Sequence, residues 1–399
     1  MEILKDTCRA LTECLCCGSK NLNHVLDLGE QPLANSYLKY KGEPEQVYPL
    51  GLNYCEDCTH LQLTHAVNPD LLFKNYLYVS GTTKTLLDYF DSFVALTEGY
   101  FPNVYSRKVL DIACNDGSQL DSYKKFGYET YGIDPAENLY ELSSKNHKIV
   151  CDYLTEESIA KFDTKFDIII AQNVFAHNTY PKEFLEICKA NLNDGGLIFI
   201  QTSQANMVEQ SQFDTVYHEH ISFFNAESMK TLAQRSGLTM INVERTNIHG
   251  TSFVFVLSAA ANEGEYSLSK ETHQSLDIVQ KFSENAKNTV SKLNNDIAKY
   301  QDKYRIVGYG AAAKGNTVLN FGKIHLDYIV DDNPLKQNMF TPGMKIPIVS
   351  LDYINKISKG ETVVWIPLSW NFFNEIKQRI QTARPSSDDI FIQLDFTRL

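Results

Sequence analysis

Five short apolar segments between residues 108 and 201 alternate with stretches of helical pattern, and this alternation constrains the fold more than any other feature. The expected strands lie at 109–113, 130–135, 148–152, 166–171 and 196–201. Helical patterns separate them, for example at 181–191. Strands that alternate with helices in this way form a doubly wound parallel sheet. The sequence therefore predicts an α/β fold for the middle of the chain.

Acidic and small polar residues follow these strands, at the edge where such sheets bind ligands. The candidates are Asp111, Asn115, Asp116, Gly117, Asp134, Asp152 and Asn173. The first turn is not G-x-G-x-x-G, so it offers no obvious cradle for a dinucleotide pyrophosphate. The acids suit a cationic ligand without phosphate, such as S-adenosylmethionine, with Asp134 on the ribose hydroxyls and Asp152 near the adenine. Any one of these acids alone would more often be a solvated residue that caps a strand end. All of them together, in this order along the chain, favour a nucleoside site.

Two further strands are expected at 240–244 and 252–257, with His249-Gly250-Thr251 in the turn between them. An antiparallel hairpin that completes a seven-stranded sheet is the arrangement of class I methyltransferases. The hairpin therefore agrees with the ligand that the acids favour.

The segment 202–223 gathers Tyr217, His218, Glu219 and His220 among aromatic residues. Such surroundings tune a histidine for proton transfer near neutral pH. His177 follows the fourth expected strand and faces the same edge, although alone it would more often cap a helix or fill a core. Two other interpretations stay open for the segment: a metal site with His218 and His220 as ligands, and a purely structural aromatic loop.

The N-terminal region carries two C-x-x-C knuckles, Cys14/Cys17 and Cys55/Cys58. Four thiolates can fill the tetrahedral shell of a zinc ion, and a filled shell indicates a structural site because no position stays open for substrate. Cys16 could compete with Cys14, but its spacing to Cys17 is wrong. Four unligated cysteines are the alternative.

The C-terminal third begins with a polar stretch at 264–303, which we interpret as a helical bridge. Gly308-x-Gly310-x-x-Ala313 then opens another strand–helix unit, with Lys314 beside it and Asp331 about 20 residues on. A helix N-terminus of this kind accepts a pyrophosphate, either of NAD or of a nucleotide-sugar. Further strands are expected at 363–366 and 390–392.

The composition of the chain limits the classes of partner that we expect it to bind. Lysine and arginine total 37 against 49 acidic residues, a net charge of −12, which argues against a nucleic-acid partner. No apolar run approaches the ~20 residues of a membrane span, and residues 1–6 lack a signal-peptide core. Nine cysteines fit reduced thiols and metal ligands better than a disulfide framework. We expect a cytoplasmic protein without a membrane partner, and nothing demands more than a monomer.

At this point the whole chain resembles the nucleotide-sugar C-methyltransferases, S-adenosylmethionine-dependent enzymes that add a methyl branch to deoxysugars. The motifs that carry the resemblance are the two knuckles, Tyr76-Leu77-Tyr78-Val79-Ser80, Asn115-Asp116-Gly117, His177, Tyr217-x-Glu219-His220, Gly308-Tyr309-Gly310-Ala311-Ala312-Ala313-Lys314, Asn333-Pro334 and Thr341-Pro342-Gly343. Two positions depart from the family: many members have an acid where His218 stands, and a glycine is common where Thr251 stands.

The resemblance implies a zinc-binding domain at 1–72, a class I methyltransferase domain at 73–260, a helical linker at 261–303 and a Rossmann-like domain at 304–399. In the family this last domain holds no dinucleotide. The implied substrate is a nucleotide-sugar, and the implied substrate-binding residues are Tyr76, Tyr78, Ser80, Gly310 and Lys314.

The implied reaction adds a methyl group to C3 of a 4-keto-deoxysugar through an enolate. We expect His220 to be the base, with Glu219 and Tyr217 orienting it or stabilising charge. His177 and Tyr78 would stabilise the enolate oxygen or share in proton transfer. Three alternatives remain: methyl transfer to oxygen or nitrogen of a sugar, an NAD-dependent sugar oxidoreductase, and a non-enzymatic scaffold.

Overall fold

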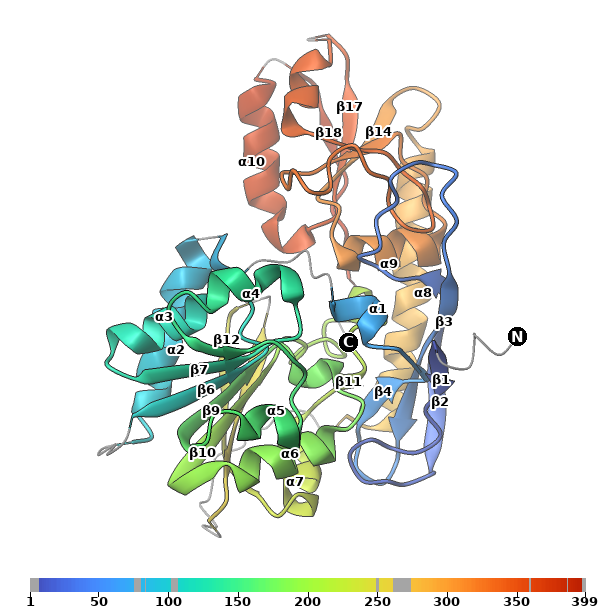
Figure 1. Ribbon diagram of the computed structural model, residues 1–399. Helices are drawn as coiled ribbons and strands as arrows, with labels where there is room; N and C mark the ends of the chain where they lie inside the picture. The colour runs from blue at the N-terminus through green and yellow to red at the C-terminus, as the bar shows by residue number, and fades with distance from the viewer. Residues whose placement is uncertain are drawn as a thin grey trace.

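The computed structural model describes residues 7–74, 80–82, 84–101, 107–248, 251–260, 274–358, 360–385 and 387–396 (Figure 1). Within these residues the strands form sheets of seven, five and four strands and one two-stranded ribbon. In Figure 1 the seven-stranded sheet lies at the lower left, the five-stranded sheet at the top and the N-terminal strands at the right. None of the described helices combines the length and the apolar character that a membrane crossing requires.

The seven-stranded sheet has the strand order β12-β13-β10-β9-β6-β7-β8. Its strands are β6 (Lys108–Ile112), β7 (Glu129–Ile133), β8 (Lys148–Val150), β9 (Phe166–Gln172), β10 (Leu192–Thr202), β12 (Thr239–Thr246) and β13 (Ser252–Ser258). The strands from β6 to β10 run parallel, whereas β13 runs antiparallel to both β10 and β12. The predicted class I methyltransferase sheet, closed by an antiparallel hairpin, is confirmed.

Helices cover both faces of this sheet, as Figure 1 shows. They are α2 (Lys84–Glu98), α3 (Ser118–Lys125), α4 (Glu137–Ser143), α5 (Glu156–Ala160), α6 (Pro181–Ala190) and α7 (Ala226–Arg235). Successive side chains of a strand point to opposite faces. Accordingly, Val109 lies in one core cluster with residues of α2 and α3, and Leu110 lies in another with residues of α5, α6 and α7.

The N-terminal region forms a four-stranded antiparallel sheet in the order β11-β4-β3-β2. Its strands are β2 (Leu22–Pro32), β3 (Val47–Cys55), β4 (Leu61–Leu63) and β11 (Ser222–Phe223). Beside it, β1 (Cys8–Ala10) pairs with β5 (His65–Val67), and α1 (Asp70–Phe73) follows. β11 comes from the segment that holds the predicted catalytic histidine, so this segment is physically part of the N-terminal sheet.

The C-terminal region is a parallel five-stranded sheet in the order β16-β15-β14-β17-β18. Its elements are β14 (Arg305–Tyr309), α9 (Ala313–Gly322), β15 (Tyr328–Val330), β16 (Ile348–Val349), η4 (Leu351–Lys356), β17 (Val363–Pro367), η5 (Trp370–Phe372), α10 (Phe373–Ala383) and β18 (Ile390–Phe391).

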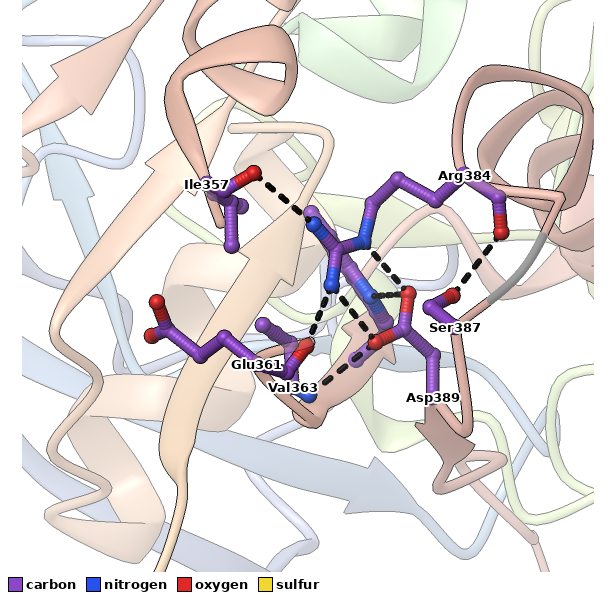
Figure 2. A network of polar contacts seen from close by, with 7 residues as sticks. Ile357, Glu361, Val363, Arg384, Ser387 and Asp389 are labelled. Carbon is purple, nitrogen blue, oxygen red and sulfur yellow. Dashed lines mark hydrogen bonds and ion pairs between the residues drawn. The ribbon is translucent and has the colours of Figure 1, made fainter. Parts of the chain in front are cut away.

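A buried ion pair joins the last elements of this sheet (Figure 2). The Arg384 guanidinium donates from Nε to Asp389 Oδ2 at 2.8 Å and from Nη2 to Asp389 Oδ1 at 3.2 Å. Asp389 also accepts from the Val363 amide and the Trp365 indole, and Arg384 donates to the Glu361 carbonyl. Because the donors surround it, the Asp389 carboxylate is satisfied although it is buried.

The long helix α8 (Leu276–Ala298) links the regions and packs against them. Buried residues recur along one face at 279, 282, 286, 290, 293 and 297. They share one core cluster with side chains of the N-terminal sheet, of the segment before β11 and of the C-terminal sheet. In Figure 1 this helix runs along the N-terminal sheet toward α9. The sequence predicted a helix here but not that it would be a core element.

Candidate active site

A cavity of about 370 Å³ opens at the carboxyl ends of β6, β7 and β9. Five of the seven residues predicted to bind the cofactor line it: Asp111, Asn115, Asp134, Asp152 and Asn173. The cavity also contains apolar and aromatic surface from Tyr89, Phe90 and Phe184. The strand-end pattern in the sequence therefore locates a real cavity.

The other two, Asp116 and Gly117, build the turn and do not line the cavity. Asp116 Oδ1 accepts from the Ser118 amide at 3.1 Å, and Oδ2 accepts from the Gly81 amide at 2.7 Å. Gly117 has φ of +83°, and a Cβ there would meet His147 at 3.0 Å. Their place is structural, since they shape the loop that presents Asn115.

The cavity is lined by acidic side chains, two of which are buried. Burial raises the pKa of both Asp111 and Asp134, and for Asp111 the neighbouring charge of Asp134 adds to the effect. Asp134 accepts the Asn115 amide on Oδ2 and the Ala136 amide on Oδ1, each at 2.8 Å, so each oxygen keeps one lone pair for a ligand. Asn173 Oδ1 is buried without a hydrogen-bond partner. A cation with hydroxyl and amine donors fits these acceptors.

His177 forms part of the cavity wall and connects it to His220. The His177 ring stacks on Phe73 at 5.4 Å between centroids and on His220 at 5.3 Å. Burial lowers the pKa of His177 to about 4, so the imidazole is neutral at pH 7. His220 itself does not line the cavity and lies behind His177.

The hydrogen bonds of His220 define its tautomer. Nδ1 lies 2.7 Å from the Thr215 carbonyl, which only accepts, so Nδ1 carries the proton. Nε2 is then the basic nitrogen, and it faces the Tyr217 hydroxyl at 2.9 Å. Burial, with the nearby His177, lowers the pKa of His220 well below its ordinary value. The structure thus brings Tyr217, His177 and His220 together.

Glu219 and His218 bond instead to residues of the N-terminal region. Glu219 Oε1 accepts from Asn35 Nδ2 at 2.7 Å. His218 Nε2 lies 3.3 Å from the Tyr48 carbonyl, and its ring meets the Tyr48 ring edge-on at 5.9 Å. Because His218 and His220 bond to different carbonyls, the geometry does not support their joint ligation of a metal.

Among the described residues, Cys14, Cys17, Cys55 and Cys58 form the one cluster that could hold a metal, with all four Sγ atoms within 4.8 Å of one another. Cys14 Sγ lies 3.5 Å from Cys58 Sγ, and Cys17 Sγ lies 3.5 Å from Cys55 Sγ. Zinc–sulfur bonds of ~2.3 Å put tetrahedral sulfurs about 3.8 Å apart, so the cluster fits zinc. Cys16 is buried next to it but is not among the four.

The backbone of the glycine-rich loop after β14 is hydrogen-bonded to other parts of the same chain. Asp331 Oδ2 accepts from the Ala311 amide at 2.6 Å, and Oδ1 accepts from the Asn333 amide at 2.8 Å. The Ala311 carbonyl accepts from Tyr37 and Lys336. Gly310 has φ of +87°, and a Cβ there would meet Ser369 Oγ at 2.4 Å. This geometry disfavours the NAD interpretation, because the acid that would bind a ribose already holds the loop.

Three family profiles match consecutive segments of the chain. A zinc binding domain matches residues 14–73, a methyltransferase domain matches 86–243, and a C-methyltransferase C-terminal domain matches 247–393. C-methyltransferase NovU of Streptomyces niveus is 27% identical over 395 residues, which cover 94% of this chain and 93% of that protein. Together, the three matched segments and the relative that spans almost the whole chain support an S-adenosylmethionine-dependent C-methyltransferase.

Other relatives match only the middle of this methyltransferase. A Ubiquinone biosynthesis O-methyltransferase of Glaesserella parasuis is 32% identical over 110 residues, and the match spans 46% of that protein. An S-adenosylmethionine-dependent methyltransferase structure from Clostridium acetobutylicum has 11% identity and a TM-score of 0.35, covering 43% of this chain and 91% of that one. The cofactors of the C-methyltransferase are S-adenosylmethionine and a structural zinc ion, which the acidic cavity and the four-cysteine cluster fit.

The remaining predicted residues of the methyltransferase differ in where they lie. Tyr76, Tyr78, His249 and Gly250 lie outside the described residues. Ser80, predicted to bind substrate, lines the cavity and donates its amide to Asn115 Oδ1 at 3.0 Å. Lys314 lies over the Trp370 ring at 5.8 Å, and the Trp370 indole donates to Asp214 Oδ2 at 2.6 Å.

Sequence reasoning missed several residues of the site. Gln172 and Gln201 line the cavity, and Gln172 Nε2 donates to Gln201 Oε1 at 3.2 Å. Their signal was available, since Gln172 is the last residue of the buried strand β9 and Gln201 is the next-to-last residue of the buried strand β10. Thr215 and Asn35 carried no such signal, because one acts through its backbone and the other comes from a distant loop.

Proposed function

We propose that this C-methyltransferase moves a methyl group to C3 of a nucleotide-linked 4-keto-deoxysugar through an enolate, with His220 as the general base. A sugar carbon becomes acidic only beside a carbonyl, so a 4-keto group is what makes C3 a possible nucleophile. The bound S-adenosylmethionine supplies an electrophilic methyl group. The task of the protein is to remove a proton from C3 and stabilise the enolate oxygen.

The arrangement around His220 carries this proposal. The Thr215 carbonyl fixes the Nδ1–H tautomer, so the Nε2 lone pair is available as a base. The Tyr217 hydroxyl oxygen lies 2.9 Å from Nε2. The hydroxyl can relay the substrate proton to Nε2, or it can move aside so that Nε2 takes the proton directly. Burial keeps the imidazole neutral near pH 7, which is the form a base requires.

Neighbouring groups complete the assignment. His177 stands between His220 and the cofactor cavity, where it can stabilise the enolate oxygen together with Tyr78. Glu219 orients the segment through Asn35. We assign the cofactor to the cavity acids with Asn115 and Asn173, the zinc to the four clustered cysteines, and the nucleotide-sugar to Tyr76, Tyr78, Ser80, Gly310 and Lys314.

The test is proton exchange at C3. Purified enzyme is incubated in D₂O with S-adenosylmethionine and a 4-keto-6-deoxy nucleotide-sugar, offered in turn as the dTDP, UDP, GDP and CDP derivative, and C3 is followed by NMR and mass spectrometry. We expect loss of the C3 proton, a gain of one methyl group and a new C-methyl singlet. His220→Ala should lower turnover by ~10²–10⁴ with cofactor affinity nearly unchanged.

The outcomes separate the alternatives. Methylation without exchange at any sugar carbon would mean transfer to oxygen or nitrogen. A fully active His220→Ala would overturn the role of the base. NADH titration tests the oxidoreductase, and the engagement of Asp331 within its own domain predicts no binding.

A further inference from the structure

An unbroken series of short contacts joins the four-cysteine cluster to the His177–His220 pair. We propose that the zinc site positions the catalytic segment (residues 213–223) through His60, Ser222 and Ile221. The inference deepens the proposed function, on which it rests for the role of His220. In this inference the N-terminal knuckles contribute to turnover by positioning the segment that holds His220.

The first contacts tie both knuckles to β4. The loop of the second knuckle closes on itself, because the Thr59 amide donates to the Cys55 carbonyl at 2.9 Å and the Cys55 amide donates to the His60 carbonyl at 2.8 Å. Gln62 in β4 holds the first knuckle: its Oε1 accepts from the Leu15 amide at 2.8 Å, and its Nε2 donates to the Glu13 carbonyl at 3.0 Å. A metal held by both knuckles therefore fixes the place of β4.

The next contacts tie β4 to the catalytic segment. β11 lies beside β4 (Figure 1) and pairs antiparallel with it. The register sets Ser222 opposite Gln62. The Leu63 amide donates to the Ile221 carbonyl at 2.8 Å. His60 Nε2 lies 3.2 Å from Ser222 Oγ, and both side chains are fully buried. The Phe224 ring packs on His60 at 4.9 Å, so the contact is shielded from water.

Ile221 connects this strand to both histidines. Its carbonyl faces β4, and its amide donates to the Ala176 carbonyl at 2.8 Å. Ile221 directly follows His220, and Ala176 directly precedes His177 in η2 (Phe175–His177). A shift of β4 would thus move both histidines together. Because a displacement of about 1 Å can cost ~10² in rate, such a shift would matter for turnover.

The linking residues lie outside the cofactor cavity, and the contacts reach its wall only at His177. None of His60, Ser222 and Ile221 lines the cavity that holds the predicted S-adenosylmethionine residues. The inference therefore predicts a separation that a general loss of folding would not produce: turnover falls while cofactor affinity stays. Arg235 offers a matched control, since its guanidinium donates to the Cys16 carbonyl and links the first knuckle to α7 rather than to the histidines.

The experiment compares full-length Ser222→Ala, His60→Phe and Arg235→Met with the wild type. Zinc content, S-adenosylmethionine affinity by calorimetry, kcat and KM for the C3 reaction, and amide hydrogen exchange of peptides covering 213–223 are measured on each. We expect Ser222→Ala and His60→Phe to lower kcat about 10–100-fold, the range for groups that support a site from behind. Exchange in 213–223 should quicken, with zinc content and cofactor affinity near wild type. Arg235→Met should change neither kcat nor exchange in this segment.

Wild-type exchange and kcat in Ser222→Ala would overturn the inference. A parallel fall of zinc content, cofactor affinity and kcat in that variant would also overturn it, because it would indicate general unfolding. The proposed function fails separately: no C3 exchange by the wild type on any of the four nucleotide derivatives would refute it. Faster exchange of 213–223 in Ser222→Ala, measured without substrate, would still support the positioning role.

Discussion

His218 and His220 are two residues apart, yet the fold gives them different surroundings. His220 looks toward His177 and the cavity, whereas His218 bonds to Tyr48 in the N-terminal sheet. The sequence presented both as candidates, because spacing alone does not say which side of an irregular segment a side chain takes. The structure separates them by their partners and gives His218 a structural place.

His218→Gln tests that place. Burial lowers the pKa of His218 to about 4, against about 6.5 in the unfolded chain. The unfolded state therefore binds one more proton between these values, so stability falls as pH drops from about 6.5 toward 4, by about 1.4 kcal/mol per pH unit. Urea unfolding of His218→Gln at pH 7 and pH 5 should show a weaker pH dependence, with kcat retained.

The exposed His325, changed to Gln, serves as the control in the same measurements. A large loss of kcat in His218→Gln at pH 7 would instead place His218 in the reaction.

The pH profile of turnover tests the histidine pair. The pKa of His177 is lowered to about 4, and that of His220 is lowered well below 6.5, in both cases chiefly by burial. In the proposed mechanism the neutral imidazole is the active form, so protonation should reduce kcat/KM only at a pH well below 6.5. An acid limb near pH 6.5 that disappears in His220→Asn would show that the pair is solvated in the working enzyme.

At the scale of elements, the sequence predicted the strands and helices whose formation depends on a local residue pattern. The strands of the middle sheet and their acidic ends were visible because a buried strand followed by a turn leaves a short apolar run. β11 left no such signal: it has two residues, and its partner β4 lies about 160 positions earlier. α8 did leave a signal, the 3–4 spacing of its buried residues, but a polar overall composition concealed it.

The Arg384–Asp389 pair of Figure 2 shows what holds the end of the C-terminal sheet. Both side chains are almost fully buried, at 5% and 3% exposed. Removing one partner leaves the other charge buried and unpaired, so Arg384→Met should lower the free energy of unfolding by about 3–5 kcal/mol. The double variant Arg384→Met, Asp389→Leu should recover much of the loss, as urea unfolding would measure.

The exposed pair Lys292–Asp395 is the comparison, and Lys292→Met should change stability little. Although burial opposes it, hydrogen bonds from Arg384, Ser387, Val363 and Trp365 hold the pKa of Asp389 below its usual value. Its contribution is therefore present above about pH 4 and is lost as the pH falls further. Equal losses in the single and double variants would refute this account.

At the scale of the whole molecule, the three sequence regions share two core clusters, in addition to clusters that lie within the middle and C-terminal regions alone. One cluster contains Leu26 and Leu52 of the N-terminal sheet, Phe213 of the catalytic segment, Phe282 of α8 and Ile366 of the C-terminal sheet. Cys14, Cys55 and Cys58 belong to a second cluster with the middle sheet, and Cys17 packs against that cluster. A sequence divided by motif cannot show this, because motifs mark what each part contains and not what it packs against.

Shared cores predict how the protein unfolds when zinc is withdrawn. A chain of this size with three independent domains would show several thermal transitions. Here the knuckles hold β4, β4 holds β11, and the cores continue into both larger sheets. Calorimetry of protein treated with a zinc chelator should therefore show the main transition itself moving to lower temperature. A small separate transition of the N-terminal region, with the main transition unmoved, would mean that the regions are energetically independent and that the contacts through Ile221 carry little.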